Sequence, residues 1–212
     1  MVNTFTYQGV KITLFGHASL CFEAQEKVVY VDPYVLGPGA RPADAILHTH
    51  PHHDHCALPN SIITSSTTVL AKGCKHPGRA LSIGDKVQLS ANIVVEVVDA
   101  YNLEKPFHPR GTGAGFIFTF GPPGRQVRVY VAGDTDHIPE MKNYKCDIAF
   151  LPVGGTWTMD VREAVGAVMD IRPKIAIPYH CNYVDKTQAD LARFKEAVEG
   201  LNIGASVRLL TT

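Results

Sequence analysis

The sequence predicts an α+β protein in which mixed β-sheets are covered by helices. Short β-prone segments, rich in valine, isoleucine and aromatic residues, follow one another through most of the chain before residue 152. Amphipathic helical patterns are confined to the remaining part, and a further strand follows each of them. Hairpins combined with strands that are separated by helices favour mixed sheets with helices packed on them.

The first half begins with a predicted β-hairpin and continues as a series of short strands. Gly16 separates the first two strands, and the polar turn 24–26 ends the second. The strands expected in this half are 10–15, 19–23, 27–31, 45–47, 68–71, 86–89 and 93–98.

The second half resembles the first. A predicted hairpin over 115–131 matches the hairpin over 19–31, and both end on the triplet Val-Tyr-Val. Asp32 follows the first triplet and Asp134 lies just after the second; further on, another aspartate opens a buried strand in each half, the second over 147–151. Chance similarity between β-hairpins is the alternative. A genuine repeat would set two β-rich halves face to face, with both loop clusters at one edge.

Two helices are expected toward the end of the chain. Asp160 and Glu163 have the spacing of a capping box, and apolar residues follow at helical intervals until Pro173 ends the helix. After a buried strand at 174–177, a second amphipathic helix is expected from Thr187 to about Gly200. A final strand is expected over 206–210.

Length and composition predict a single domain over residues 1–212. The chain has 45% apolar residues, and its 20 basic side chains balance its 20 acidic ones, so nucleic acid is not an expected partner. The sequence lacks a signal peptide and any apolar run of ~20 residues, which predicts a cytoplasmic protein outside the membrane. Five scattered cysteines without a C-x-x-C pair predict reduced thiols. Oligomeric state is not indicated.

Five histidines and an aspartate are concentrated in residues 48–55. Within this run, His50, His52, Asp54 and His55 form the pattern H-x-H-x-D-H. Imidazole and carboxylate are the ligands that Zn²⁺ and related cations prefer. An affinity tag or a polar surface loop would be the alternative, but a tag is not expected in the middle of a chain. The cluster therefore predicts a metal site.

Two residues outside the cluster are candidate ligands because each follows a predicted strand. Asp134 comes directly after Gly133, which permits a tight turn, although a turn or helix cap would also explain an aspartate there. His180 follows the buried strand over 174–177. A histidine in the core or on the surface, without a functional role, is the alternative for His180.

Taken together, these motifs resemble the metallo-β-lactamase superfamily. Further motifs resemble its single-domain, lactonase-like branch, which includes ascorbate-6-phosphate lactonase-like hydrolases. The motifs are Gly16-His17-Ala18-Ser19, Asp32-Pro33, H-x-H-x-D-H at 50–55, Gly133-Asp134-Thr135-Asp136, Leu151-Pro152-Val153-Gly154-Gly155 and Thr158-Met159-Asp160. The resemblance implies a four-layer αββα sandwich with its metals at the open edge between two mixed sheets.

The resemblance also implies roles for individual residues. His50 and His52 would bind a first metal, Asp54, His55 and His180 would bind a second, and Asp134 would bridge the two. The chain departs from the family at Asn102, which stands where the family usually has a third histidine for the first metal.

Three residues could compensate for this departure or contact the substrate. His108 could supply the missing imidazole, could contact substrate, or could be an ordinary loop residue. His17 could support a ligand or contact substrate, and Asn102 remains a weak candidate ligand. His48 and His53 are expected to orient neighbours or face outward, and Cys56 and Cys181 need be no more than small buried residues.

The predicted function is hydrolysis of a small molecule by water that one or two Zn²⁺ ions activate, with Mn²⁺, Fe²⁺ or Ni²⁺ as other candidates. An ester, lactone or phosphodiester would be cleaved, and Asp54 would orient the water and transfer a proton. β-Lactamase activity is disfavoured, because such enzymes often carry cysteine where Asp134 stands. A metal-binding sensory or scaffold protein with little turnover is the alternative, which the substitution at Asn102 favours.

Overall fold

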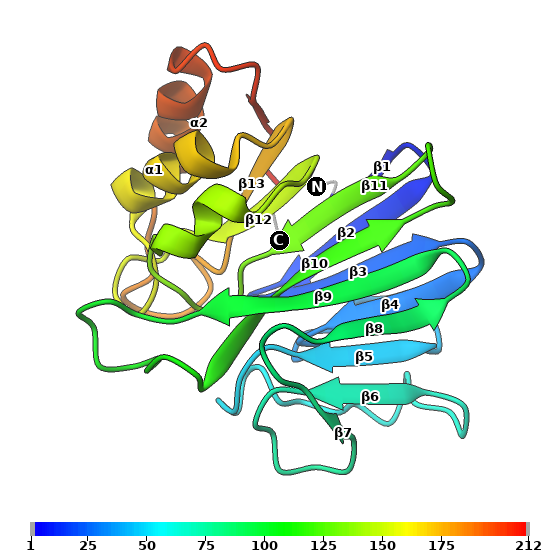
Figure 1. Ribbon diagram of the computed structural model, residues 1–212. Helices are drawn as coiled ribbons and strands as arrows, with labels where there is room; N and C mark the ends of the chain where they lie inside the picture. The colour runs from blue at the N-terminus through cyan, green and yellow to red at the C-terminus, as the bar shows by residue number, and fades with distance from the viewer. Residues whose placement is uncertain (1–2, 211–212) are drawn as a thin grey trace.

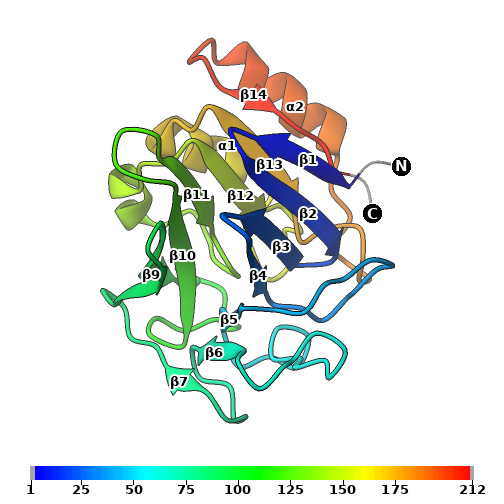
Figure 2. The ribbon, with the colours of Figure 1, turned by 90° about the vertical axis from the view of Figure 1, so that its right-hand side faces the viewer.

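Two seven-stranded sheets pack face to face in the computed structural model, which describes residues 3–210 (Figures 1 and 2). The strands of the first sheet follow chain order from β1 to β7, and the second sheet runs from β14 back to β8. Each sheet contains antiparallel and parallel pairs. The predicted α+β sandwich of two mixed sheets is confirmed.

Most strands lie where the sequence predicts them. The first sheet contains β1 (Thr4–Tyr7), β2 (Val10–Gly16), β3 (Ser19–Ala24), β4 (Lys27–Val31), β5 (Ala45–His48), β6 (Thr68–Ala71) and β7 (Arg79–Ala80). The second sheet contains β8 (Lys86–Ser90), β9 (Ile93–Ala100), β10 (Gly113–Phe120), β11 (Val127–Val131), β12 (Ile148–Pro152), β13 (Ile175–Tyr179) and β14 (Ser206–Val207). The short strands β1 and β7 were not predicted, and β14 is shorter than expected.

The two halves repeat the same strand arrangement. In one sheet β3 pairs antiparallel with β4, which pairs parallel with β5; in the other, β10, β11 and β12 repeat this order. The central tyrosines of the two Val-Tyr-Val triplets, Tyr30 and Tyr130, belong to outer clusters, whereas the flanking valines join the core between the sheets. The predicted internal repeat is confirmed. It brings the ends of equivalent strands to one edge of the sandwich.

Aromatic side chains from both sheets fill the space between them. Phe22 of β3 reaches across to Phe118, Phe120 and Phe150, with ring centroids 5.1, 5.7 and 6.3 Å away. All four rings are almost completely buried. These contacts join the two sheets into one core.

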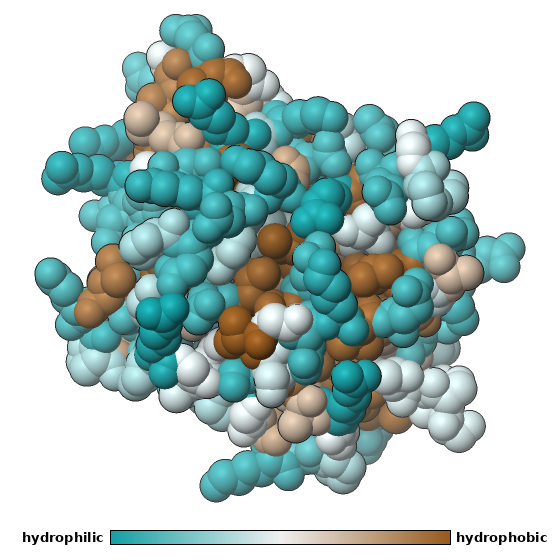
Figure 3. All heavy atoms as spheres, in the orientation of Figure 1, coloured by the Kyte–Doolittle hydropathy of each residue, from teal (hydrophilic) through white to brown (hydrophobic). Residues whose placement is uncertain are grey.

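The outer faces of the two sheets are covered differently. Helices α1 (Val161–Ile171) and α2 (Leu191–Gly200), together with the 3₁₀ helix η1 (Pro139–Asn143), contribute to the cluster on the outer side of the second sheet (Figure 1). Between residues 3 and 210 no helix covers the first sheet, whose outer side packs against the loops that contain Ala43 and Ile62. One helical layer of the expected αββα arrangement is therefore replaced by loops. Hydrophilic side chains dominate the face shown in Figure 3. Hydrophobic side chains are exposed there mainly over the strands.

Side-chain caps define where the helices begin. Asp160 accepts from the backbone N–H of Glu163, and the Glu163 carboxylate accepts from the N–H of Asp160, which is the predicted capping box. Asp190 caps α2, so this helix begins at Leu191 and not at Thr187 as expected. No helix within residues 3–210 combines the length and apolar character required to cross a bilayer.

The cysteines differ from the sequence-based prediction. Cys56 and Cys74 form a disulfide with their Cα atoms 5.8 Å apart, whereas Cys21, Cys146 and Cys181 are free. The expectation that all five are thiols is therefore wrong for two of them. Sequence spacing did not reveal the pair because its members belong to loops that follow different strands, β5 and β6.

Replacing Phe22 with alanine should test the aromatic contact between the sheets. We expect Phe22→Ala to lower the free energy of unfolding by about 3–5 kcal/mol, because it removes a buried ring and leaves a cavity. Urea titration monitored by circular dichroism measures this change. Met169→Ala, which shortens an exposed side chain, is the matched control and should change stability by less than about 0.5 kcal/mol. Equal effects would contradict this description of the core.

Candidate metal centre

Loops that leave both sheets bring every predicted site residue to one edge of the sandwich. The loops follow strands whose ends the internal repeat places at that edge. His17 follows β2, Asp32 follows β4, residues 49–55 follow β5, Asn102 and His108 follow β9, Asp134 follows β11, and His180 follows β13. Most of these side chains are almost completely buried.

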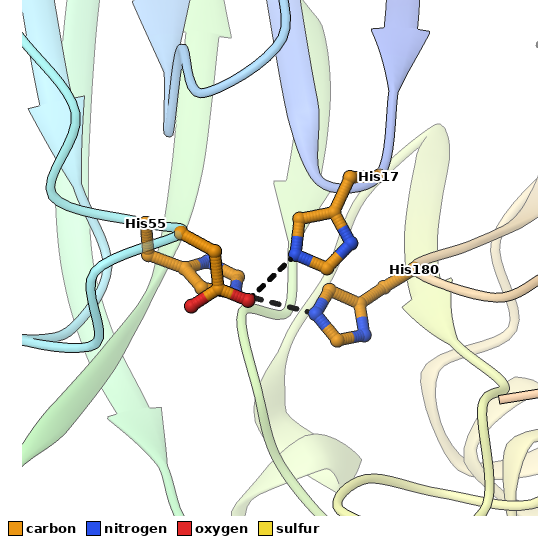
Figure 4. A group of neighbouring side chains, drawn as sticks. His17, His55 and His180 are labelled. Atoms are coloured by element: carbon orange, nitrogen blue, oxygen red, sulfur yellow. Dashed lines mark hydrogen bonds and ion pairs between the residues drawn. The ribbon is translucent and has the colours of Figure 1, made fainter. Parts of the chain in front are cut away.

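One group of potential ligands contains Asp54, His55 and His180, together with His17. The Nε2 atoms of His55 and His180 lie 3.2 Å apart, and the Nε2 of His17 lies 2.9 Å from Oδ2 of Asp54. Figure 4 shows the rings of His17, His55 and His180 converging from three separate segments of the chain. The centroids of the His17 and His180 rings are 4.4 Å apart.

A second group contains His50, His52 and His108. Nε2 of His50 lies 3.0 Å from Nδ1 of His52, and the ring centroids of His52 and His108 are 4.9 Å apart. Two nitrogen ligands in a tetrahedral zinc site stand about 3.3 Å apart, given bonds of about 2.0–2.1 Å. The spacing in both groups is therefore close to what one cation requires. The structure brings His108 next to His50 and His52, and its role as the third ligand stays a prediction.

The carboxylate of Asp134 lies between the two groups. Its Oδ1 is 3.4 Å from Nε2 of His180 and 3.7 Å from Nε2 of His55, while its Oδ2 is 3.3 Å from Nε2 of His108 and 3.9 Å from Nε2 of His50. Each oxygen thus faces one group. This position is compatible with the bridging role that the family resemblance implies, which stays a prediction.

Gly133 allows the turn before Asp134 to pack closely against Ala114 of β10. It has φ +67°, and a Cβ atom at this position would lie 2.8 Å from the carbonyl oxygen of Ala114. The backbone N–H of Gly133 donates to the Tyr179 hydroxyl at 3.0 Å. Any larger residue would therefore push the turn away from the neighbouring strand.

The donor atoms in these groups fit divalent cations. Nε2 of His108 and Oδ1 of Asp134 are buried and have no hydrogen-bond partner among the described residues. A buried polar atom without a partner costs about 1–3 kcal/mol, which a bound cation would relieve. Imidazoles surrounding a carboxylate with these spacings form a donor set suited to zinc and similar metals.

Asp32 orients His55, a role that the sequence analysis did not assign. Its Oδ2 accepts from Nδ1 of His55 at 2.7 Å and from the Thr49 hydroxyl at 2.6 Å, and its Oδ1 accepts from the Thr49 N–H at 2.8 Å. This bonding leaves Nε2 of His55 to face the centre, as carboxylates behind metal-binding histidines usually do. The repeat offered a signal, because Asp32 follows β4 much as Asp134 follows β11.

Asn102 lies behind His108 and not among the potential ligands. Its Oδ1 accepts from Nδ1 of His108 at 3.0 Å and from the His108 N–H at 2.9 Å. Its Nδ2 donates to Oδ1 of Asp136 and to the carbonyl oxygen of Trp157, both at 3.0 Å. Both ends of the Asn102 amide are therefore occupied by hydrogen bonds. These bonds direct Nε2 of His108 toward Asp134.

The remaining histidines of the cluster face elsewhere. The side chain of His53 is 87% exposed at the mouth of the site. His48 is completely buried, and its ring packs against His76, with centroids 4.6 Å apart. Neither belongs to the two groups around Asp134.

Burial and charge set the protonation of the centre. Burial lowers the pKa of His50 well below its usual value and that of His180 to about 4, so both imidazoles are neutral near pH 7. Burial opposes charge on His55 as well, but the carboxylates of Asp134 and Asp32 raise its pKa to about 9. Burial would also raise the pKa of Asp134, yet His180 and His55 hold it well below its usual value. Asp134 is therefore an ionised carboxylate ready to bind a cation.

A cleft of about 260 Å³ opens onto both groups. Asp54, His108, Asp134 and His180 line its floor, whereas Phe107, Trp157 and Val184 provide an apolar side. Among the residues described as lining this cleft there is no lysine or arginine. The cleft therefore presents potential metal ligands beside an apolar and uncharged wall.

Comparisons with known proteins agree with this geometry. Residues 11–180 match the model of the β-lactamase superfamily domain, and a UPF0173 metal-dependent hydrolase from Staphylothermus marinus is 37% identical over 198 residues, covering 84% of this chain and 83% of that protein. The chain belongs to the metal-dependent hydrolases of the β-lactamase superfamily. This places the two groups around Asp134 in a family named for its dependence on metals.

Two solved structures share this fold. A protein from Parabacteroides distasonis, provisionally designated a metal-dependent hydrolase, is 34% identical with a TM-score of 0.83, covering 98% of this chain and 96% of its own. Igni18, a metallo hydrolase from Ignicoccus hospitalis, has a TM-score of 0.76 at 24% identity, covering 94% of each chain. The second likeness concerns the fold alone.

Replacing Asn102 tests whether it positions His108. We expect Asn102→Ala to weaken binding of the more weakly held metal by about 10–100-fold, because His108 loses the partner that fixes its ring. Competition against a chromophoric chelator measures the affinity. Asn143→Ala, in an exposed position of η1, is the control and should bind metal like the unmodified protein. Unchanged affinity in Asn102→Ala would contradict the positioning role.

Proposed function

We propose that this protein hydrolyses a neutral ester or lactone bond in a small molecule with an apolar portion. The observation that carries this proposal is the cleft, in which a two-metal donor set lies beside Phe107, Trp157 and Val184. His50, His52 and His108 would hold one cation, and Asp54, His55 and His180 the other, with Asp134 shared between them. Zn²⁺ suits this donor set best, and Mn²⁺, Fe²⁺ and Ni²⁺ are accepted by similar ligands.

The absence of cationic side chains in the described lining favours an uncharged substrate. Sites for phosphate esters usually surround the anion with arginine or lysine as well as with metal ions. Here the aromatic pair Phe107 and Trp157, with ring centroids 6.5 Å apart, borders the cleft instead. Phosphodiester hydrolysis is the second candidate, because the cations themselves could bind an anionic substrate.

Cations in this centre would lower the pKa of water and stabilise negative charge on the substrate. The protein side chains supply the orientation. The two oxygens of Asp134 fix the spacing between the two groups, and Asn102 and Asp32 hold the rings of His108 and His55 in the required directions. The apolar wall binds the non-reacting part of the substrate and excludes water from it.

Asp54 is the proposed proton carrier. Its carboxylate lines the cleft, and Oδ2 is held by Nε2 of His17 at 2.9 Å. Burial would raise its pKa, but the hydrogen bond from His17 and the positive charge of His55 hold the pKa well below its ordinary value. An ionised Asp54 can accept a proton from the attacking water and then deliver that proton to the leaving group.

A sensory or scaffold role with little turnover is a less well supported alternative. The substitution at Asn102 favoured it in the sequence, because a first site with only two histidines would be weak. The proximity of His108 to His50 and His52 supports a first site with three imidazoles. The proton carrier and the open cleft together favour catalysis.

The variant Asp54→Asn tests the proposed function. With saturating metal, we expect kcat on a neutral aryl ester or lactone to fall by about 10²–10⁴-fold, because the amide cannot accept the proton. Because Asp54 is also a proposed ligand, metal content is measured by plasma mass spectrometry, and kcat is compared at metal concentrations that give the variant and the unmodified protein equal occupancy. Asp85→Asn, in the turn before β8, is the matched control and should retain activity.

A substrate panel distinguishes the reaction classes. We expect kcat/KM for neutral lactones and aryl esters to exceed that for bis-aryl phosphodiesters of similar size. The opposite order would favour the phosphodiester alternative. Slow turnover of every class, unaffected by Asp54→Asn, would favour the scaffold.

A further inference from the structure

A second cluster of histidine and cysteine lies behind the loop that carries the catalytic ligands. It comprises His48 at the end of β5, Cys56 just past the loop, and Cys74 and His76 in the segment that follows β6. One donor atom from each of His48, Cys74 and His76 lies within 4.8 Å of the other two. None of these residues belongs to the two groups around Asp134.

Both imidazoles present a free nitrogen to this cluster. Nδ1 of His48 donates to the carbonyl oxygen of His55 at 2.6 Å, and Nδ1 of His76 donates to the carbonyl oxygen of Pro77 at 3.3 Å. Each ring therefore carries its lone pair on Nε2. Both Nε2 atoms are buried without a hydrogen-bond partner in the described part of the chain, and the side chain of His48 is completely buried. Metal-ligating histidines show this bonding pattern.

Cys74 belongs to this group of potential ligands, and its disulfide partner Cys56 lies next to it. Cys56 and Cys74 form a disulfide whose Cα atoms lie 5.8 Å apart, and their Sγ atoms lie 3.2 and 3.5 Å from the carbonyl oxygen of His50. Two thiolates on one zinc ion stand about 3.8 Å apart, given bonds of about 2.3 Å. Rotation of the two side chains can provide that separation once the disulfide is open.

We propose that the reduced protein binds a zinc-like divalent cation through His48, Cys56, Cys74 and His76, at a site separate from the catalytic centre. A dithiol reductant supplies two electrons and two protons, which convert the disulfide into two thiols while the reductant becomes a cyclic disulfide. Cation binding then releases the two thiol protons to solvent. The resulting two-cysteine, two-histidine set is that of closed, structural zinc sites.

This site would hold both ends of the catalytic loop. His48 and Cys56 immediately flank residues 49–55, which contain four proposed ligands of the catalytic metals. The segment after β6 packs against the same loop, since a Cβ atom on Gly73 would lie 3.3 Å from Pro51. A cation here would fix the loop in the reduced protein, as the disulfide does in the oxidised protein.

Cobalt spectroscopy separates this site from the catalytic one, whose proposed ligands are nitrogen and oxygen only. The full-length protein is first reduced with a dithiol and then freed of reductant and metal under anaerobic conditions. A thiol assay should find five thiols per chain before Co²⁺ is added stepwise. We expect a near-ultraviolet sulfur-to-cobalt charge-transfer band and one more bound Co²⁺ per chain than in the protein with its disulfide intact.

Variants assign the band to these residues. The double variant Cys56→Ser/Cys74→Ser should abolish the band. His76→Ala should weaken the affinity for Co²⁺, measured from the band, by more than about 100-fold, which exceeds the loss expected when only a residue behind a ligand is removed. His137→Ala removes a half-buried imidazole elsewhere and should keep the band, as should Cys146→Ser. If His76→Ala does not fold by circular dichroism, His76→Gln replaces it.

Two results would overturn the proposal. The first is reduced, folded protein with five free thiols and no charge-transfer band at saturating Co²⁺. The second is a band that survives the double variant Cys56→Ser/Cys74→Ser, or one that appears with the disulfide intact, because Cys21, Cys146 or Cys181 would then hold the metal.

Discussion

The candidate centre depends on one buried carboxylate surrounded by imidazoles. Asp134 is almost inaccessible to water, and an isolated charge in such a place would be very costly. Four histidine nitrogens within 3.9 Å, divided between its two oxygens, offset that cost and belong to two adjacent groups of potential ligands. The charge of Asp134 therefore both requires the histidines and organises them.

The internal repeat of the fold places Asp134 and the surrounding histidines at one edge of the sandwich. Equivalent strands of the two sheets end at one edge, and an aspartate follows each equivalent strand, Asp32 after β4 and Asp134 after β11. Asp32 orients His55 from behind, and Asp134 lies between the two groups of potential ligands. The aromatic contacts of Phe22 hold the two sheets together and so keep the two halves of the centre in register.

Local sequence was sufficient for most strands, both helices and the core of the site. Alternating or β-branched runs bounded by turns mark strands, and H-x-H-x-D-H places four side chains in one loop whatever the surroundings. The sequence could not show how His108 relates to Asn102, because that depends on the loop 103–107 folding back so that two hydrogen bonds form between them. It also missed the pairing of Cys56 with Cys74 and the replacement of one helical layer by loops, since both depend on contacts between distant segments.

Anomalous diffraction from crystals of the zinc-loaded protein tests the central claim most directly. The account predicts two anomalous peaks on either side of Asp134, each bonded to one of its oxygens, with His50, His52 and His108 around one and Asp54, His55 and His180 around the other. A single peak that leaves His108 unbound, or peaks that do not contact Asp134, would contradict it.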